Sequence, residues 1–285
     1  MILEHARGRI ETDRCLVMGI LNRTPDSFYD GGRMDLRDSV AHAESLVAQG
    51  ADLLDVGAVK AGPGPAVPED VELDRLLPLL QSLAREDGVP LSVETSRSGV
   101  ARAALAEGAA LVNDVSALAD PGLAPACAEG GAGLIVMHHG GQIRGRPRHP
   151  RYDDVVASVA GELTDLASMA ERAGLHRDQL VIDPGLDFGK TTFHSLELMR
   201  RLEELTALPW PVLVAPSRKD VVGETLDLDL DDRLEGTLAL VALAVMKGAS
   251  IVRVHDVRAA TRVVAMVEAV AGKRPPANPI RGLWD

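Results

Sequence analysis

The strongest constraint on the fold is an alternation that repeats eight times along the chain. Short aliphatic, often β-branched runs alternate with longer stretches rich in Ala, Leu and charged residues, a pattern typical of parallel strands joined by crossover helices. Eight such units predict an α/β fold closed into a (β/α)8 TIM barrel. The expected strands are 15–21, 52–56, 91–93, 110–112, 133–137, 180–182, 212–214 and 251–254, and the helical patterns include 39–49, 97–107, 153–173 and 232–247.

The composition fits one large aliphatic domain. Hydrophobic residues make up 46% of the 285 residues and aromatic residues only 2%, which suits a barrel interior filled by branched side chains. Gly50, Gly108 and Gly248 each stand between a helical pattern and a strand, where glycine can take the left-handed conformation that ends a helix. No linker rich in Pro, Gly or Ser divides the chain, so we expect a single domain over residues 1–285.

Charge and hydropathy exclude several classes of function. A formal net charge of −12 disfavours non-specific binding to nucleic acid or to an anionic membrane. The longest apolar run, 236–246, is far shorter than the roughly 20 residues that span a bilayer. Residues 1–15 carry charges where a signal peptide needs an apolar stretch. We therefore expect a cytoplasmic protein in which Cys15 and Cys127 are buried thiols.

A polar or ionisable side chain stands at or just after the carboxyl end of every expected strand. Because these ends converge on the face where barrel enzymes keep their sites, we expect the side chains to meet. A hydrophobic core has no use for so many polar groups, since burying an unpaired charge is costly. Taken singly, each has an ordinary alternative, such as capping the next helix. The residues are Asn22, Asp55, Glu94, Asn113, His138, Asp183, Lys219, Arg253 and His255.

The longest irregular stretch, 138–152, is basic and rich in Gly and Pro. One interpretation is an ordinary surface loop. The other is a lid that supplies Arg144, Arg146 or Arg148 to an anion. The sequence by itself leaves both open.

A series of short motifs resembles the dihydropteroate synthases. The motifs occur in the family's order and cover nearly the whole chain, which makes the series far more specific than any one of them. Members of that family are TIM barrels that condense 6-hydroxymethyl-7,8-dihydropterin pyrophosphate with p-aminobenzoate and release pyrophosphate. The motifs are MGILNRTPDSFYDGG at 18–32, DLLDVG at 52–57, VET at 93–95, VND at 112–114, IDPGLDFGKT at 182–191, SRK at 217–219, RLEGT at 233–237 and RVHD at 253–256.

The resemblance implies a role for most of the polar residues at the strand ends. The pterin would be bound by Glu94, Asn113, Asp183 and Lys219. The pyrophosphate would be held by Asn22, Arg253 and His255, and Asn22 would also bind Mg²⁺. The catalytic group would be Lys219, Arg253 and His255. The acceptor side would be lined by Phe188, Gly189 and Asp220.

The chemistry of the reaction accounts for these residue types. A pterin edge presents adjacent amide and amino groups, which pair with the acceptor oxygens of a carboxylate and with a carboxamide. The leaving pyrophosphate develops negative charge, which arginine, histidine and a hard cation stabilise. No covalent enzyme intermediate is needed.

The chain departs from the family pattern in four places, and two of them weaken the contacts to the second substrate. Where the family reads Gly-Gly-Glu-Ser-Thr-Arg-Pro-Gly, this chain has GAVKAGPG at 57–64, so Thr and Arg are replaced by Ala61 and Gly62. Asp220 replaces the Ser that receives the p-aminobenzoate carboxylate, and it either repels that carboxylate or caps a helix away from it. Glu94 replaces an Asp. Arg23 replaces a small apolar residue and could return positive charge.

Three functions remain open on the sequence. The first is a dihydropteroate synthase-type transferase whose condensation is weakened by the altered acceptor side. The second is a non-catalytic pterin-binding paralogue, because the pattern resembles the divergent second copy of this synthase in some actinobacteria. The third, a pterin-methyl transferase barrel with a corrinoid partner, is disfavoured because Lys219, Arg253 and His255 suit pyrophosphate. The resemblance also implies a homodimer through helices near the end of the chain, where 257–271 could supply a face.

Overall fold

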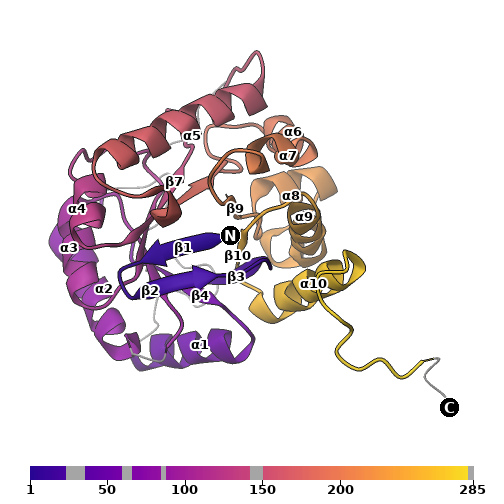
Figure 1. The fold of residues 1–285 in the computed structure, drawn as a ribbon, viewed down its shortest axis with the longest axis horizontal. Helices are drawn as coiled ribbons and strands as arrows, with labels where there is room; N and C mark the ends of the chain where they lie inside the picture. Colours follow the sequence, from indigo (N-terminus) through magenta and orange to yellow (C-terminus); the bar gives the residue numbers. More distant parts are fainter. Residues whose placement is uncertain (24–35, 60–65, 85–87, 142–149, 282–285) are drawn as a thin grey trace.

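The predicted (β/α)8 barrel is confirmed in the computed structural model, which describes residues 1–23, 36–59, 66–84, 88–141 and 150–281. Eight parallel strands follow the order β8-β7-β6-β5-β4-β3-β10-β9 (Figure 1). A further parallel bridge between Ile182 and Val212 joins the two ends of this order, so the barrel is nearly closed. The strands are β3 (Leu16–Asn22), β4 (Leu53–Gly57), β5 (Leu91–Glu94), β6 (Leu111–Asp114), β7 (Gly133–Met137), β8 (Leu180–Asp183), β9 (Leu213–Val214) and β10 (Ile251–Val254).

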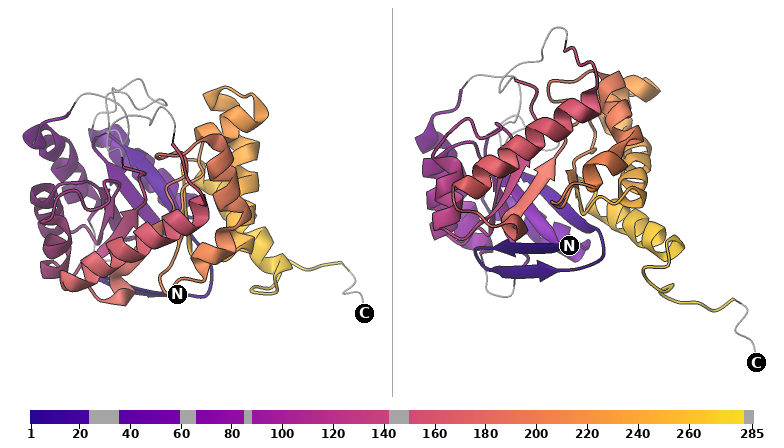
Figure 2. Two further views of the ribbon diagram at one scale, coloured as in Figure 1. Left: turned by 90° about the horizontal axis from the view of Figure 1, so that it is seen from above. Right: turned by 45° about the horizontal axis from the view of Figure 1, so that its top comes forward.

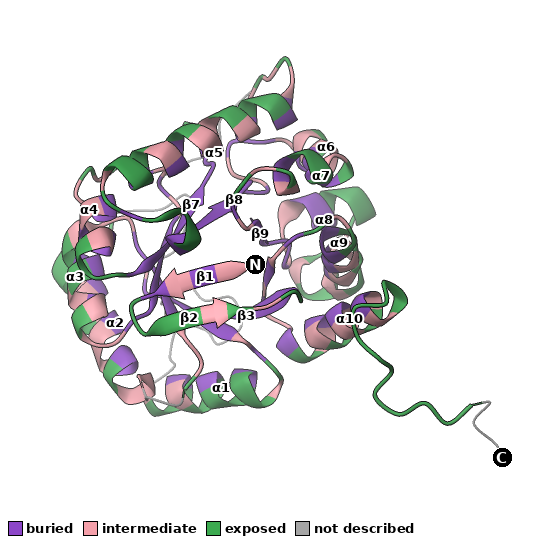
Figure 3. Cartoon of the chain, viewed as in Figure 1, coloured by how far each residue is buried: buried purple, intermediate pink, exposed green. Residues whose placement is uncertain are grey.

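Helices surround the barrel and turn their apolar stripes toward it, while their outer faces are exposed (Figures 1 and 3). Gly50, Gly108 and Gly248 end helices as predicted, with φ of 99°, 93° and 89°. The helices are α1 (Leu36–Ala48), α2 (Glu69–Leu83), α3 (Ser98–Ala106), α4 (Leu123–Glu129), α5 (Val155–Arg172), α6 (Thr192–Arg200), α7 (Leu202–Thr206), α8 (Asp220–Leu226), α9 (Leu234–Met246) and α10 (Val257–Val270). Short 3₁₀ turns lie at Arg177–Gln179 and Leu230–Asp232.

The core has two parts, as a barrel requires. The larger part fills the space between the strands and the helices, where Val17, Leu54 and Val93 are buried. The smaller part lies inside the barrel and consists of aliphatic side chains with one methionine. Its members include Leu16, Met18, Leu53, Leu111, Ile135, Val181, Leu213 and Ile251. The barrel interior is therefore packed, and a site is left only at an end.

An antiparallel hairpin closes the amino-terminal end of the barrel (Figure 2). It consists of β1 (Ile2–His5) and β2 (Gly8–Glu11), which the sequence pattern did not predict. Leu3 is fully buried among the side chains of the barrel interior. Just after β1, the Ala6 N–H donates to the Ala110 carbonyl at 3.2 Å. With this end plugged, the carboxyl ends of the strands are the open face.

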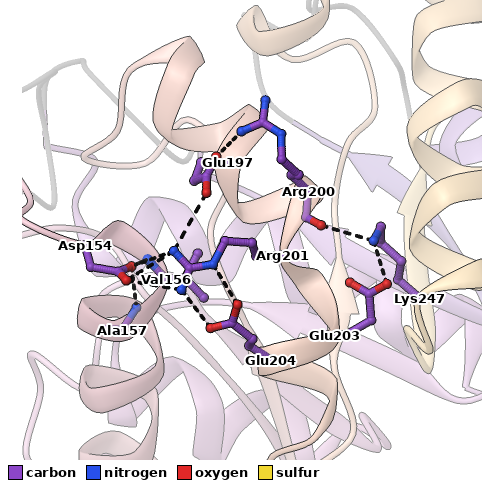
Figure 4. Close-up of polar contacts among 9 residues, drawn as sticks. All are labelled: Asp154, Val156, Ala157, Glu197, Arg200, Arg201, Glu203, Glu204 and Lys247. Carbon is purple, nitrogen blue, oxygen red and sulfur yellow. Dashed lines mark hydrogen bonds and ion pairs between the residues drawn. The ribbon is translucent and has the colours of Figure 1, made fainter.

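Ion pairs bind the segment after β8 to its neighbours on the outside of the barrel (Figure 4). Arg201, between α6 and α7, contacts Asp154 at 3.1 Å and Glu204 at 2.6 Å. Lys247, at the end of α9, contacts Glu203 at 2.6 Å. Exposed pairs of this kind contribute little stability singly; they link the α6–α7 segment to the start of α5 and the end of α9.

Two further expectations concern the cysteines and the membrane. Cys15 and Cys127 are free and buried, as predicted, and burial raises the pKa of each thiol to about 12. Among the described residues, no helix is long and apolar enough to cross a membrane.

Candidate active site

The strand register places several of the predicted residues in one row at the carboxyl end of the barrel. Asn22 pairs with Gly57, Gly57 with Glu94, and Glu94 with Asn113. These residues are the last or nearly the last of their strands, rather than loop residues. Gly57 leaves room in this row, because a Cβ there would lie 3.1 Å from Asn22 Oδ1 and 3.8 Å from Glu94 Oε1.

Arg253 is the electrostatic centre of the row. Its Nε donates to Asp55 Oδ2 and its Nη2 to Glu94 Oε2, each at 2.6 Å. Asn113 Nδ2 also donates to Asp55 Oδ2, at 2.9 Å. Asp55 Oδ1 is buried and has no hydrogen-bond partner among the residues that the structure describes. One guanidinium thus links three strands through two carboxylates, and β6 joins the network through an amide.

Burial changes the ionisation of the two carboxyl groups predicted to bind the pterin. Burial raises the pKa of Glu94 to about 7, against the attraction of Arg253 and with the repulsion of Asp55. Burial also raises the pKa of Asp183, against the effects of Lys219 and of a hydrogen bond from Gly185. That bond joins the Gly185 N–H to Asp183 Oδ1 at 2.7 Å. Raised pKa values of carboxyl groups in a strand-end cluster are typical of functional sites.

Lys219 reaches into the site from the segment after β9. Its Nζ donates to the Leu186 carbonyl at 2.6 Å and lies 4.9 Å from the centre of the Phe188 ring, a cation–π arrangement. Burial lowers the pKa of Lys219, and the charges of Asp183 and Asp187 oppose that change. The segment after β8 therefore holds this ammonium by a carbonyl and an aromatic ring.

His255 contacts Ser217, which lies two residues before Lys219. The His255 N–H donates to Ser217 Oγ at 3.1 Å, and Ser217 Oγ lies 2.9 Å from His255 Nδ1. Burial and the nearby charge of Arg253 lower the pKa of His255 to about 4, so the imidazole is neutral at neutral pH. A hydroxyl proton donated to Nδ1 leaves the hydrogen on Nε2, where it can be offered to an anion.

His138 does not join the open cluster. It is buried, with Nδ1 2.7 Å from Lys190 Nζ and Nε2 3.3 Å from a Glu162 oxygen. Burial and the charge of Lys190 lower the pKa of His138 to about 3. Sequence reasoning placed His138 at the strand end correctly and assigned no role to Lys190, although Lys190 lies inside the 182–191 motif.

On the acceptor side, the expectation that Asp220 caps a helix is wrong. Lys219 occupies the N-cap position of α8 and the Val221 N–H donates to Asp187 Oδ2 at 3.1 Å, so α8 is not capped by its first residue, Asp220. Its Oδ1 instead accepts from Arg233 Nη1 at 3.2 Å, which offsets its negative charge. Arg23 donates to the Arg75 carbonyl on α2.

Other acceptor-side expectations are only partly covered by the structure. Phe188 and Gly189 lie in the turn after β8, where Tyr152 Oη donates to the Gly189 carbonyl at 2.9 Å. Ala61, Gly62 and the arginines of 144–148 lie outside the described residues.

The described residues contain no protein-only metal centre. No group of three or more His, Cys, Asp or Glu side chains among them could hold a metal ion. Asn22 is exposed and supplies one neutral oxygen beside Glu94. Mg²⁺ commonly takes few protein ligands and the rest from water and phosphate oxygens, so Asn22 fits a magnesium ion that arrives with a diphosphate.

A family model described as pterin binding enzyme matches residues 18–255. The chain belongs to the dihydropteroate synthase family of pterin-binding enzymes. A relative from Mycobacterium tuberculosis, named inactive dihydropteroate synthase 2, is 49% identical, and the alignment covers 95% of this chain and 87% of the relative. A relative of the same name from Mycobacterium leprae is 47% identical, and the alignment covers 96% of this chain and 97% of the relative. The dihydropteroate synthase of Bacillus subtilis is 39% identical over 92% of this chain and 90% of its own.

Solved structures of the family superpose on the whole barrel. The Yersinia pestis dihydropteroate synthase in complex with a sulfonamide drug has a TM-score of 0.91 and 37% identity, covering 96% of this chain and all of the other. The Xanthomonas albilineans enzyme with 4-aminobenzoic acid has a TM-score of 0.86 and 40% identity, covering 95% and 96%. The family and fold expected from the motifs are thereby confirmed.

Proposed function

We propose that this chain is a pterin-binding member of the dihydropteroate synthase family that binds 6-hydroxymethyl-7,8-dihydropterin pyrophosphate and condenses it with p-aminobenzoate weakly or not at all. The observation that carries the proposal is the uneven state of the site. Asn113 and Arg253 both donate to Asp55, and Asp183 and Lys219 interact electrostatically with each other and with Arg253. The family's acceptor-side Thr and Arg, by contrast, are replaced by Ala61 and Gly62.

The pterin side has the groups that its ligand requires. An ionised Asp183 accepts hydrogen bonds, and Asn113 can both donate and accept, so together they match an amide and an amino group on one ring edge. Arg253, the neutral His255 and Asn22 are the candidates for the pyrophosphate, with Mg²⁺ shared between Asn22 and the phosphate oxygens. Arg253 donates to Asp55 and Glu94 through Nε and Nη2, and because a guanidinium has five N–H donors, the diphosphate would be met by the others.

The relatives support a reduced activity rather than the full reaction. The mycobacterial relatives at 47% and 49% identity are named inactive synthases, while relatives at 39% and 40% are named synthases. An active dihydropteroate synthase is the second candidate, favoured by the likeness to the Xanthomonas albilineans enzyme that was solved with 4-aminobenzoic acid.

Calorimetry with the pterin pyrophosphate tests the binding part. We expect saturable binding, and Asp183→Asn should weaken it by about 10- to 100-fold, the scale of a lost charged hydrogen bond. The Asn side chain still accepts from Gly185, so the turn should persist. An unchanged Kd in this variant would mean that the pterin binds elsewhere.

Turnover tests the second part. Pyrophosphate release is followed with pterin pyrophosphate and p-aminobenzoate, and we expect a rate far below that of an active synthase run beside it. Efficient release would establish the second candidate and refute the reduced activity.

A further inference from the structure

We propose that Lys190 is a positioning residue whose buried ammonium holds the turn 184–189 and thereby sets the places of Phe188 and Lys219 at the pterin site. The inference rests on the proposed function only in assuming that this site binds a pterin. It begins with a lysine that is 8% exposed and contacts Phe188, a residue expected to meet the ligand, through the main-chain carbonyl.

The Lys190 ammonium is surrounded by acceptors. Its Nζ donates to the Gly185 carbonyl at 2.9 Å and to the Phe188 carbonyl at 2.8 Å, and it lies 2.7 Å from His138 Nδ1. An ammonium has three N–H donors, and each finds a partner here. Two of those partners belong to the turn, so the side chain ties both of its ends.

Glu162 determines how the proton is shared between Lys190 and His138. A carboxylate oxygen of Glu162 lies 3.3 Å from His138 Nε2. Because an ionised carboxylate only accepts hydrogen bonds, the imidazole hydrogen belongs on Nε2, and Nδ1 is left as an acceptor. Lys190 must then donate to Nδ1, and serving this nitrogen and both turn carbonyls takes the three N–H groups of its charged form, while burial lowers the pKa of Lys190 to about 7. The chain of contacts runs from α5 through β7 into the turn after β8.

The turn has little other freedom. Gly185 and Gly189 have φ of 61° and 62°, and a Cβ at Gly189 would lie 2.6 Å from the Gly140 Cα. Asp187 links the turn to α8, since its Oδ2 accepts from the Val221 N–H at 3.1 Å. The carbonyls held by Lys190 flank Leu186 and Asp187, and it is the Leu186 carbonyl and the Phe188 ring that hold Lys219.

Lys190 thus acts on the site through the backbone. Without the Lys190 ammonium, the Phe188 carbonyl loses this donor and the Gly185 carbonyl keeps the Phe188 N–H, at 3.0 Å. Carbonyls that lose a buried donor turn toward water or other donors. The Leu186 carbonyl and the Phe188 ring move with them. Lys219 then loses its two supports in the site, while the barrel strands are untouched.

The test uses Lys190→Met in the full chain, with Lys247→Met as the matched control. Lys247 also donates to a backbone carbonyl, that of Arg200 at 3.1 Å, but it lies at the end of α9. The first readout is ¹⁹F NMR of protein labelled with fluorophenylalanine. The sequence has only three Phe residues, at 28, 188 and 193, so Phe188→Leu and Phe193→Leu assign the signals.

We expect Lys190→Met to shift or broaden the Phe188 resonance and leave that of Phe193 in place, and Lys247→Met to alter neither. Calorimetry with the pterin pyrophosphate should show the Kd rising at least about tenfold in Lys190→Met and staying within about twofold in the control. An unaltered Phe188 resonance together with an unaltered Kd would overturn the proposal. A wild-type chain that binds no pterin would refute the proposed function, and the Phe188 resonance would still decide the role of Lys190.

If Lys190→Met does not fold, Lys190→Gln and Lys247→Gln give the same decision. The Gln amide is one bond shorter than Lys and has two N–H donors in place of three, so it cannot hold both turn carbonyls and His138 as Lys190 does. Its Phe188 resonance should therefore shift, and a Phe188 resonance identical to the wild type would overturn the proposal.

Discussion

At the scale of single residues, the site depends on how Arg253 is shared. Its guanidinium is held by Asp55 and Glu94, and Asp55 also accepts from Asn113. Breaking a buried pair by removing one charge usually destabilises a protein, because the other charge is left uncompensated. Here two carboxylates compete for one cation, so removing the charge of Glu94 leaves Arg253 still paired.

This sharing predicts an unusual pH dependence for Glu94→Gln. Burial raises the pKa of Glu94 from 4.5 to about 7, so the folded protein binds more protons at this group than the unfolded chain between those values. The contribution of Glu94 to stability is therefore fully present below about pH 4.5 and is lost as the pH rises toward 7. We expect thermal denaturation of both proteins between about pH 5 and pH 8 to show the Tm of the variant rising relative to that of the wild type as the pH rises. A difference in Tm that stays constant over this range would contradict the raised pKa.

At the scale of elements, α9 and α10 leave an apolar surface on the outside of the barrel. Met246 on α9 and Met266 and Val270 on α10 are 71%, 64% and 77% exposed. The two helices pack against each other, and each has buried residues, Val241 on α9 and Val264 on α10. The homodimer that the family resemblance implies would cover such a surface, and it stays a prediction.

Sedimentation velocity tests that dimer. We expect the wild type to be dimeric at micromolar concentration and Met266→Glu to raise the dimer dissociation constant by about tenfold or more, since a charge would be buried without a partner. Met169→Glu on α5, where the methionine is 45% exposed, is the matched control and should remain dimeric. A wild type that sediments as a monomer would refute the dimer.

At the scale of the whole molecule, the packed core and the polar candidate site occupy different parts of the barrel. The hairpin of β1 and β2 plugs one end with Leu3, and the polar row occupies the other. Residues from β3, β4, β5, β6, β8 and β10 meet there, so a function can be altered in the loops without altering the barrel.

Restoring the family's acceptor residues should therefore restore condensation. We expect Ala61→Thr, Gly62→Arg and Asp220→Ser together to raise kcat/KM for p-aminobenzoate by about a hundredfold, which corresponds to about 2.7 kcal/mol of transition-state stabilisation. Asp220→Ser alone should change little, because Arg233 already offsets the charge of Asp220. Steady-state pyrophosphate release measures both, and a triple variant no faster than the wild type would place the defect elsewhere.

The sequence by itself determined the fold and the family. Eight aliphatic runs separated by helical patterns predict the barrel because each strand must be covered by a helix on its outer face. All eight strands lie within two residues of their predicted bounds. The hairpin of β1 and β2 was missed because its alternating charges hide the one position, Leu3, that is fully buried.

Only the tertiary structure decided which polar groups are partners. Local patterns placed Asp55, Glu94 and Arg253 at strand ends, but their ion pairs join residues up to 198 positions apart in the chain. The sequence leaves Asp220 open as a helix cap or a repulsive charge. The structure adds its partner, Arg233, which lies 13 residues further along the chain. His138 and Lys190 form a buried pair because β7 and β8 are adjacent in the sheet. Periodicity reports which face of an element is apolar, whereas the partner of a charge is set by closure of the barrel.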